Sequence, residues 1–260
     1  MAQLHIEKFG AGEPIVLVHG WAMHSGIWRD FAKQLGQSFE VTCVDLPGHG
    51  RSDAIEQFDL ASITELLAEN IDLTSACWLG WSMGGNIVIE LAKRFPERVD
   101  SLIVVAGNPC FTETSDWPGI RASDLDAFAN NLTIDCKTTL LRFLALQTHG
   151  VANAKSLLNK LQIVLGECDV PSISTLQGGL EILKSVDQRN DLKALGCPSL
   201  VIMGEQDTLV PVAVANKMQV LAPDWQIHIL AKTGHLPFLS KPEPVINLIC
   251  EFINDYPNVL

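Results

Sequence analysis

Short apolar runs alternate with amphipathic stretches over the first hundred residues, and this alternation constrains the fold more than any other feature. The apolar runs, each of a length that suits a buried strand, are 14–18, 41–45, 76–80 and 99–106. The stretches between them carry apolar residues at helical spacing and are 26–35, 60–71 and 83–95. The pattern predicts an α/β protein whose strands are joined by crossover helices in a mostly parallel sheet.

The alternation stops between residues 109 and 188. Here the sequence becomes helical and loop-like, with long helical runs at 125–148 and 151–165. The rhythm of strands and helices then resumes in four elements, expected at 198–203, 212–221, 225–230 and 242–256. We therefore expect one α/β core, residues 1–108 and 189–260, with a helical cap, residues 109–188, inserted into it.

The charge of the chain argues against several classes of partner. With 18 basic and 30 acidic side chains in 260 residues, the formal net charge is -12, which opposes binding to phosphate backbones and anionic lipid. No apolar stretch approaches the length of a membrane span, and residues 1–10 lack the basic region and apolar run of a signal peptide. We expect a cytoplasmic monomer that binds neither nucleic acid nor membrane.

The seven cysteines do not form a metal or redox motif. They are odd in number, lie at least 26 residues apart and include no C-x-x-C pair, and no other cluster has metal-ligand spacing. We expect reduced cysteines that are mostly buried as small apolar side chains. The sequence thus predicts no metal and no organic cofactor.

The segment Gly80-Trp81-Ser82-Met83-Gly84 is a G-x-S-x-G motif between an expected strand and an expected helix. A serine at such a turn is held in a strained backbone conformation, and the flanking glycines remove side chains that would clash there. By chance the pentapeptide should occur in roughly one chain in ten of this length, so its position at the junction carries the argument. Ser82 is the candidate nucleophile.

A serine nucleophile needs a base, which follows it in the chain at such turns. Three histidines lie beyond Ser82. His149 falls in the cap and His228 inside an expected strand, where packing or surface roles are the better interpretation. His235 follows the strand 225–230 in a Gly-His loop, so it lies where open α/β sheets place their sites and is the candidate base.

The base needs an acid that orients it, and three carboxylates compete for this role. Asp207 comes four residues after the strand 198–203 and directly before Thr208 and Leu209. Glu205 in the same loop and Asp187 at the end of the cap are the alternatives. Position after the strand favours Asp207.

Two backbone N–H groups are expected to stabilise the oxyanion of the transition state. One is the N–H of Met83, directly after the nucleophile, and the other is that of Trp21, in the glycine-containing loop after the first buried strand. His19 in the same loop is interpreted as a hydrogen-bonding residue that stabilises the loop. The turn 45–52 contains no phosphate-binding glycine pattern and is expected to be structural.

Together these segments resemble the α/β-hydrolase superfamily. They are H-G-W at 19–21, D-L-P-G-H-G-R-S at 45–52, G-W-S-M-G at 80–84, G-E-Q-D-T-L-V-P at 204–211 and T-G-H-L-P-F at 233–238. The resemblance spans about residues 14–256 and implies the α/β-hydrolase fold. It implies function less tightly, because the superfamily includes esterases, thioesterases, lipases, haloperoxidases and even receptors.

More particular segments resemble the pimeloyl-acyl-carrier-protein methyl ester esterases of biotin synthesis. They are Leu79 to Ser82 at the turn and, in the cap, 115–120, 142–147 and 178–183. The resemblance implies that Ser82, Asp207 and His235 form a catalytic triad and that Trp21 and Met83 hold the oxyanion. It also implies a substrate channel lined by Phe143, Leu144, Ala145, Leu146 and Gln147. Met83 replaces the leucine typical of the family, which leaves the backbone donor unchanged.

The family's partner is an acidic acyl-carrier protein whose phosphopantetheine arm adds a phosphate, so the cap should be basic near the channel mouth. Residues 137–160 contain no acidic side chain and carry four basic ones, which we call the basic strip: Lys137, Arg142, Lys155 and Lys160. Composition predicts about three acids there, so the strip is a candidate docking surface, with an ordinary solvated helix face as the alternative.

Three functions remain open from the sequence. The first is hydrolysis of the methyl ester of pimeloyl-carrier protein, releasing methanol. The second is a general short-chain carboxylesterase or thioesterase on the same scaffold. The third is a ligand-binding receptor that retains the triad, for which the sequence shows no output surface other than the basic strip.

Overall fold

The computed structural model describes residues 2–256, and its centre is a seven-stranded sheet within that range. The sheet order is β1-β3-β2-β4-β5-β6-β7, and all neighbouring strands are parallel except β1, which runs antiparallel to β3. The strands are β1 (Ile6–Phe9), β2 (Glu13–Val18), β3 (Phe39–Val44), β4 (Ala76–Trp81), β5 (Val99–Val105), β6 (Ser199–Gly204) and β7 (Gln226–Leu230). The predicted mostly parallel α/β sheet is confirmed.

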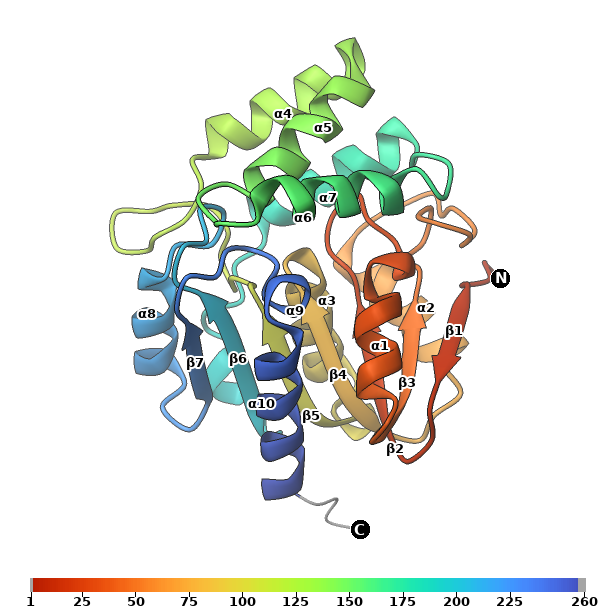
Figure 1. Cartoon of the computed structure of the whole chain (residues 1–260), viewed down its shortest axis with the longest axis vertical. Coiled ribbons are helices and arrows are strands. Elements are labelled where there is room, and N and C mark those ends of the chain that lie inside the picture. The colour runs from red at the N-terminus through yellow and green to blue at the C-terminus, as the bar shows by residue number, and fades with distance from the viewer. Residues whose placement is uncertain (1, 257–260) are drawn as a thin grey trace.

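Helices cover both faces of the sheet (Figure 1). Val16 and Val18 of β2 face the cluster that contains the apolar sides of α2 (Leu60–Asn70), α3 (Met83–Arg94) and α8 (Ala213–Leu221). Ile15 and Leu17 face the cluster of α1 (Arg29–Leu35) and α10 (Pro242–Asp255). Because both faces are buried, the central strands are continuous apolar runs, which is why the sequence revealed them.

The remaining helical elements of the core are short. They are the 3₁₀ turns Ser25–Trp28, Pro96–Arg98 and Leu192–Ala194 and the short helix α9 (Pro237–Ser240). The strand β1 was not expected from the sequence, because it has only four residues and two of them are charged. No helix within residues 2–256 has the length and apolar character needed to cross a membrane.

Four helices of the cap lie over the carboxyl ends of the strands (Figure 1): α4 (Ala122–Ile134), α5 (Cys136–Gln147), α6 (Ala154–Leu165) and α7 (Ile173–Ser185). The expectation of one helical run over 125–148 is wrong. The chain leaves the helical conformation at Asp135 (φ -150°, ψ 88°), whose carboxylate caps the next helix by accepting from the Thr138 N–H.

The two ends of the cap lie together on the core. Cys110 and Asp187 form an isolated antiparallel bridge. Nearby, the buried side-chain amide of Asn86 donates to the Asn108 carbonyl and to the side-chain oxygen of Gln188, and the Gln188 side-chain N–H donates to the Asn86 carbonyl. These contacts support the division of the chain into 1–108, 109–188 and 189–260, which stays a prediction; Met1 and residues 257–260 lie outside the described residues.

All seven cysteines are free. Cys43, Cys77 and Cys110 are buried, and the other four are partly exposed, so fewer are buried than the sequence suggested. Burial raises the pKa of the Cys77 thiol to about 12, so this thiol stays protonated and apolar in character.

Candidate active site

Ser82 stands at the sharp turn between β4 and α3. Its backbone φ is positive (φ 56°, ψ -121°), a strained conformation for a residue with a side chain. A Cβ on Gly80 would overlap the carbonyl group of Gly84, and a Cβ on Gly84 would overlap the carbonyl oxygen of Val18. Both glycines are therefore required by close backbone contacts, as the motif indicated.

Ser82, His235 and Asp207 form one chain of hydrogen bonds. The Ser82 hydroxyl donates to Nε2 of His235 at 3.0 Å, and Nδ1–H of His235 donates to the Asp207 carboxylate at 2.7 Å. The carboxylate also accepts the N–H groups of Leu209 and Val210 at 2.8 and 3.0 Å. This network orients the imidazole so that Nε2 is the nitrogen that can take a proton from the serine.

The other candidates for the acid and the base lie elsewhere. The carboxylate of Glu205 accepts the Lys232 N–H, and that of Asp187 pairs with Arg189 at 2.6 Å. His228 lies half-buried in β7, and His149 is exposed in the turn after α5. Among these candidates the structure brings only Asp207 to the base.

The indole of Trp81 supports the loop that carries His235. Its Nε1–H donates to the His235 carbonyl at 2.9 Å, and its ring lies 5.7 Å from the imidazole. Ser82, Asp207 and His235 are all buried, so water reaches them poorly in this closed arrangement. Electrostatic interactions inside such a site are stronger than in water.

The two expected oxyanion donors lie close to Ser82. Met83 is the first residue of α3, so its N–H has no acceptor within the helix. A Cβ on Gly20 would lie 3.2 Å from the Ser82 Cβ, so the Gly20-Trp21 loop passes directly against the nucleophile. Within residues 2–256, neither the Trp21 nor the Met83 N–H donates to a protein acceptor.

Helix α7 of the cap rests on both residues, a contact that sequence reasoning missed. The Trp21 indole donates to the Leu176 carbonyl at 2.8 Å. A Cβ on Gly179 would lie 2.5 Å from Cδ1 of Trp21 and 3.2 Å from Sδ of Met83. The signal was the Gly178-Gly179 pair inside a helical run, since glycine in a helix interior often marks a close approach.

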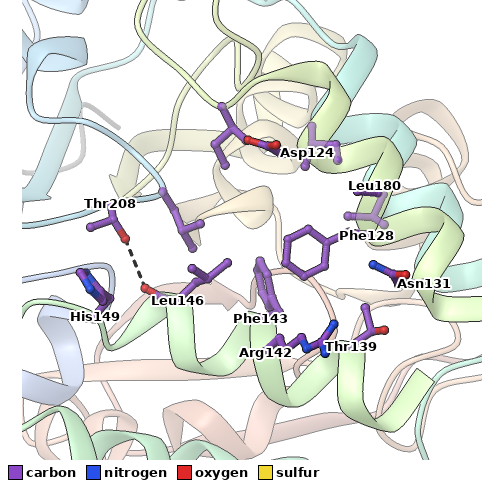
Figure 2. Close-up of a pocket in the computed structure, with 14 residues that line it drawn as sticks. Asp124, Phe128, Asn131, Thr139, Arg142, Phe143, Leu146, His149, Leu180 and Thr208 are labelled. Carbon is purple, nitrogen blue, oxygen red and sulfur yellow. Dashed lines mark hydrogen bonds between the residues drawn. The ribbon is translucent and has the colours of Figure 1, made fainter. Parts of the chain in front are cut away.

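A cavity of about 570 Å³ lies between α4, α5, α7 and the loop after Asp207 (Figure 2). Its walls are mainly apolar and include Leu125, Phe128, Phe143, Leu146, Leu180 and Leu209. The ring of Phe143 lies edge-on to Trp21, with centroids 4.7 Å apart, and also edge-on to Phe128 at 6.0 Å. Phe143 therefore contacts both the cavity and Trp21, whose loop lies beside Ser82.

Only part of the expected channel segment faces this cavity. Phe143 and Leu146 line it, whereas Leu144 packs into the opposite core cluster and Ala145 is exposed. Successive helical residues point about 100° apart, so five in a row cannot share one wall. Gln147 is 2% exposed, and neither polar atom of its side chain has a hydrogen-bond partner in the described structure.

The basic strip divides into two kinds of residue. Lys137, Arg142 and Lys155 are exposed and make no ion pair within residues 2–256, and Arg142 also lines the cavity (Figure 2). Lys160 instead pairs with Asp30 of α1 at 2.8 Å. It thus joins the cap to the core, as does the ion pair of Arg29 with Glu167 at 2.9 Å.

Residues 13–242 match the family model of the α/β hydrolase fold. The chain is 41% identical over 249 residues to a pimeloyl-[acyl-carrier protein] methyl ester esterase of Nitrosomonas europaea, covering 95% of this chain and 98% of that protein. It is 39% identical to the protein of the same name from Serratia marcescens, covering 97% and 99%. This chain belongs to their family of α/β hydrolases. The resemblance inferred from the motifs is confirmed.

Solved α/β-hydrolase structures agree in fold. An esterase of Exiguobacterium antarcticum matches with a TM-score of 0.87 at 22% identity, covering 97% of this chain and 96% of that one. An enol-lactonase of Burkholderia xenovorans matches with a TM-score of 0.83 at 18% identity, covering 97% of each chain. No three His, Cys, Asp or Glu side chains gather as a metal site in the described part of this α/β hydrolase.

Proposed function

We propose that this chain hydrolyses the methyl ester of pimeloyl-acyl-carrier protein to pimeloyl-carrier protein and methanol, as a serine carboxylesterase of biotin synthesis. The observation that carries the proposal is the unbroken hydrogen-bond chain from Ser82 through His235 to Asp207. Relatives that bear this activity in their names match nearly the whole chain, cap included, which supports the choice of substrate.

The proposed reaction uses the triad in two steps. The Ser82 oxygen attacks the ester carbonyl while Nε2 of His235 takes its proton, and the oxyanion is held by the N–H groups of Trp21 and Met83. His235 then gives the proton to the departing methoxide, leaving an acyl-enzyme and methanol. A water molecule, deprotonated by the same nitrogen, attacks the acyl-enzyme, and His235 returns that proton to the departing Ser82 oxygen, which releases the carboxylic acid product and restores the triad. The reaction requires neither a metal nor an organic cofactor.

The cavity under the cap is the proposed site of the acyl chain. Its volume lies within the range typical of ligand pockets, and its apolar walls suit a run of methylene groups. In the channel segment Phe143 to Gln147, we assign the cavity wall to Phe143 and Leu146. Gln147 does not line the cavity, and we assign its buried, unpartnered side-chain amide a hydrogen bond to the ester group and not to the methylene chain, because buried polar groups are normally satisfied.

The exposed part of the basic strip is the proposed docking surface for the carrier protein. Lys137, Arg142 and Lys155 present unpaired positive charge, and Arg142 does so at the cavity itself. An acidic partner and its phosphate would be attracted to such charges over several ångströms. Lys160 contributes less, because Asp30 already neutralises it. We further propose that the protein acts as a cytoplasmic monomer and binds neither nucleic acid nor membrane.

The direct test is turnover of methyl-pimeloyl-carrier protein, followed as methanol release or as the mass change of the carrier protein. Wild type should convert it, and Ser82→Ala should lower kcat by about 10⁴-fold or more. Hydrolysis that persists in Ser82→Ala would overturn the assignment of the nucleophile. Equal efficiency on a small free ester and on the carrier-bound ester would support the general carboxylesterase instead. A signalling role that survives in Ser82→Ala would support a receptor.

A further inference from the structure

His19 is completely buried in the loop after β2, and both nitrogens of its ring are bonded. Nε2 accepts the Leu46 N–H at 3.0 Å, and Nδ1 lies 2.9 Å from the Gly20 carbonyl oxygen. A backbone N–H can only donate, so Nε2 carries no proton. The proton of the neutral ring is therefore on Nδ1, which donates to the Gly20 carbonyl.

The Gly20 carbonyl belongs to the same peptide group as the Trp21 N–H. No peptide bond in the described structure is cis, and in a trans peptide the C=O and N–H point in opposite directions. Holding the Gly20 oxygen on the His19 side therefore turns the Trp21 N–H to the other side. The Met23 N–H also donates to this oxygen, at 3.3 Å, so the carbonyl accepts from two directions.

We propose that His19 is a positioning residue that sets the direction of the Trp21 N–H toward the oxyanion. The inference rests on the proposed function, in which that N–H stabilises the transition state. His19 itself does not touch the substrate in this account. It acts through the Gly20–Trp21 peptide, which lies against Ser82 because Gly20 has no side chain.

The acceptor side of His19 is anchored as firmly as the donor side. Leu46 follows Asp45, whose buried carboxylate accepts the Ser25 N–H at 2.5 Å and the Arg51 N–H at 2.9 Å. The turn 45–52, which the sequence presented as structural, thus fixes the ring through the Leu46 N–H. A donor held in advance needs no reorganisation when the oxyanion forms, which is the source of its effect on rate.

Burial also keeps the ring in the required protonation state. It lowers the pKa of His19 to about 3, so the ring stays neutral wherever the enzyme is folded and active. A second proton would have to sit on Nε2 and face the Leu46 N–H, which would break that hydrogen bond.

The test compares His19→Ala with His49→Phe as a matched control. His49 is equally buried, its ring centroid lies 5.3 Å from that of His19, and within residues 2–256 its ring bonds only to the Pro47 carbonyl. The substrate is p-nitrophenyl butyrate, and the transition-state probe is butylboronic acid, which forms a tetrahedral adduct with the serine. For His19→Ala we expect kcat to fall about ten- to a hundredfold with KM within twofold. The boronate Ki should rise by a similar factor, with an unchanged pH profile. His49→Phe should stay within about twofold.

The outcomes separate this inference from the function it rests on. If Ser82→Ala retains esterase activity, both the triad and the inference fail. If Ser82→Ala is inactive but His19→Ala keeps its kcat and boronate affinity, the triad stands and the positioning role is wrong. If His19→Ala does not fold, ¹⁵N NMR of the wild-type histidines decides. A protected Nδ1–H on His19 supports the inference, and an Nε2–H tautomer overturns it.

Discussion

On the core side of Ser82, glycines allow backbone segments to lie directly against each other. On the cap side, a glycine allows a helix to pack directly against side chains. A Cβ on Gly84 would overlap the Val18 carbonyl, which cannot move without disturbing the sheet. A Cβ on Gly179 of α7 would instead meet the indole of Trp21. A side chain can adjust where a strand cannot. Backbone contacts therefore fix the core side, and side-chain packing fixes the cap side. Substitutions on the two sides should have different effects on stability and activity.

The largest expected effect is that of Gly84→Ala. The new methyl group has no space between α3 and β2, so we expect a loss of at least ~3 kcal/mol in the free energy of unfolding, or no folded protein. Urea unfolding followed by circular dichroism measures it. Gly196→Ala is the control, since nothing lies within 4 Å of a Cβ there, and it should stay within about 0.5 kcal/mol. A wild-type free energy of unfolding for Gly84→Ala would show that backbone contacts do not require glycine at this turn.

Acid should also destabilise the core side. Burial lowers the pKa of His19 to about 3 and that of His49 to about 4, from 6.5 in the unfolded chain. Below pH 6.5 the unfolded chain therefore binds protons that the folded chain does not bind. The stability that the two neutral rings contribute is present above pH 6.5 and is lost as the pH falls toward 4. Each histidine contributes a slope of up to about 1.4 kcal/mol per pH unit.

The measurement is urea unfolding at pH values from 7 to 4.5, with His49→Phe as the matched variant. Removing one of the two buried histidines should reduce the slope by up to about 1.4 kcal/mol per pH unit. An identical slope in wild type and variant would mean that His49 is not a neutral buried ring in the folded protein.

On the cap side, Gly179→Ala should affect activity more than stability. Alanine favours the helix by up to about 1 kcal/mol, which offsets the displaced indole, so the melting temperature should change little. We expect kcat/KM for a small ester to fall about tenfold, because one proposed oxyanion donor is the backbone N–H of Trp21, which shifts when the indole is displaced. Steady-state kinetics on folded protein measures this. A collapse in stability as large as that of Gly84→Ala would abolish the contrast between the two sides.

The smallest expected effect is the loss of the ion pair between the cap and α1. Lys160→Ala removes a partly exposed contact with Asp30 and should lower the free energy of unfolding by about 1 kcal/mol or less. The same variant should leave kcat on a small ester unchanged. A loss of several kcal/mol would mean that this contact, and not the buried amides at the cap ends, holds the cap in place.

The same contrast explains which features could be predicted from the sequence. Ser82, His235 and Asp207 follow strand ends in a fixed order, and the glycines of the turn are required locally, so one sequence suffices to find them. Leu144 and Ala145 do not line the cavity, which the sequence could not show because which face of a helix meets a cavity depends on the partner helices. The break at Asp135 was missed for a similar reason, since neighbouring helical patterns merge when only a cap residue separates them.

The contact of α7 with Trp21 joins segments 155 residues apart, so the Gly178-Gly179 pair could indicate a close approach but could not identify Trp21 as the residue approached. The buried hydrogen-bond partners of His19 could not be predicted from motifs either, because they depend on where the turn 45–52 folds back. The motifs therefore located the three side chains that the structure joins by hydrogen bonds, whereas the contacts that support them are visible only in the structure.

We infer that the core performs the ester hydrolysis and that the cap selects a carrier-bound ester as the substrate. The most direct measurement is the ratio of kcat/KM for methyl-pimeloyl-carrier protein to that for p-nitrophenyl butyrate, in wild type and in the double variant Arg142→Glu, Lys155→Glu. We expect this ratio to fall at least tenfold in the variant, mainly through loss of carrier-protein turnover, and to fall in wild type as salt is added. An unchanged ratio in the variant would contradict this inference.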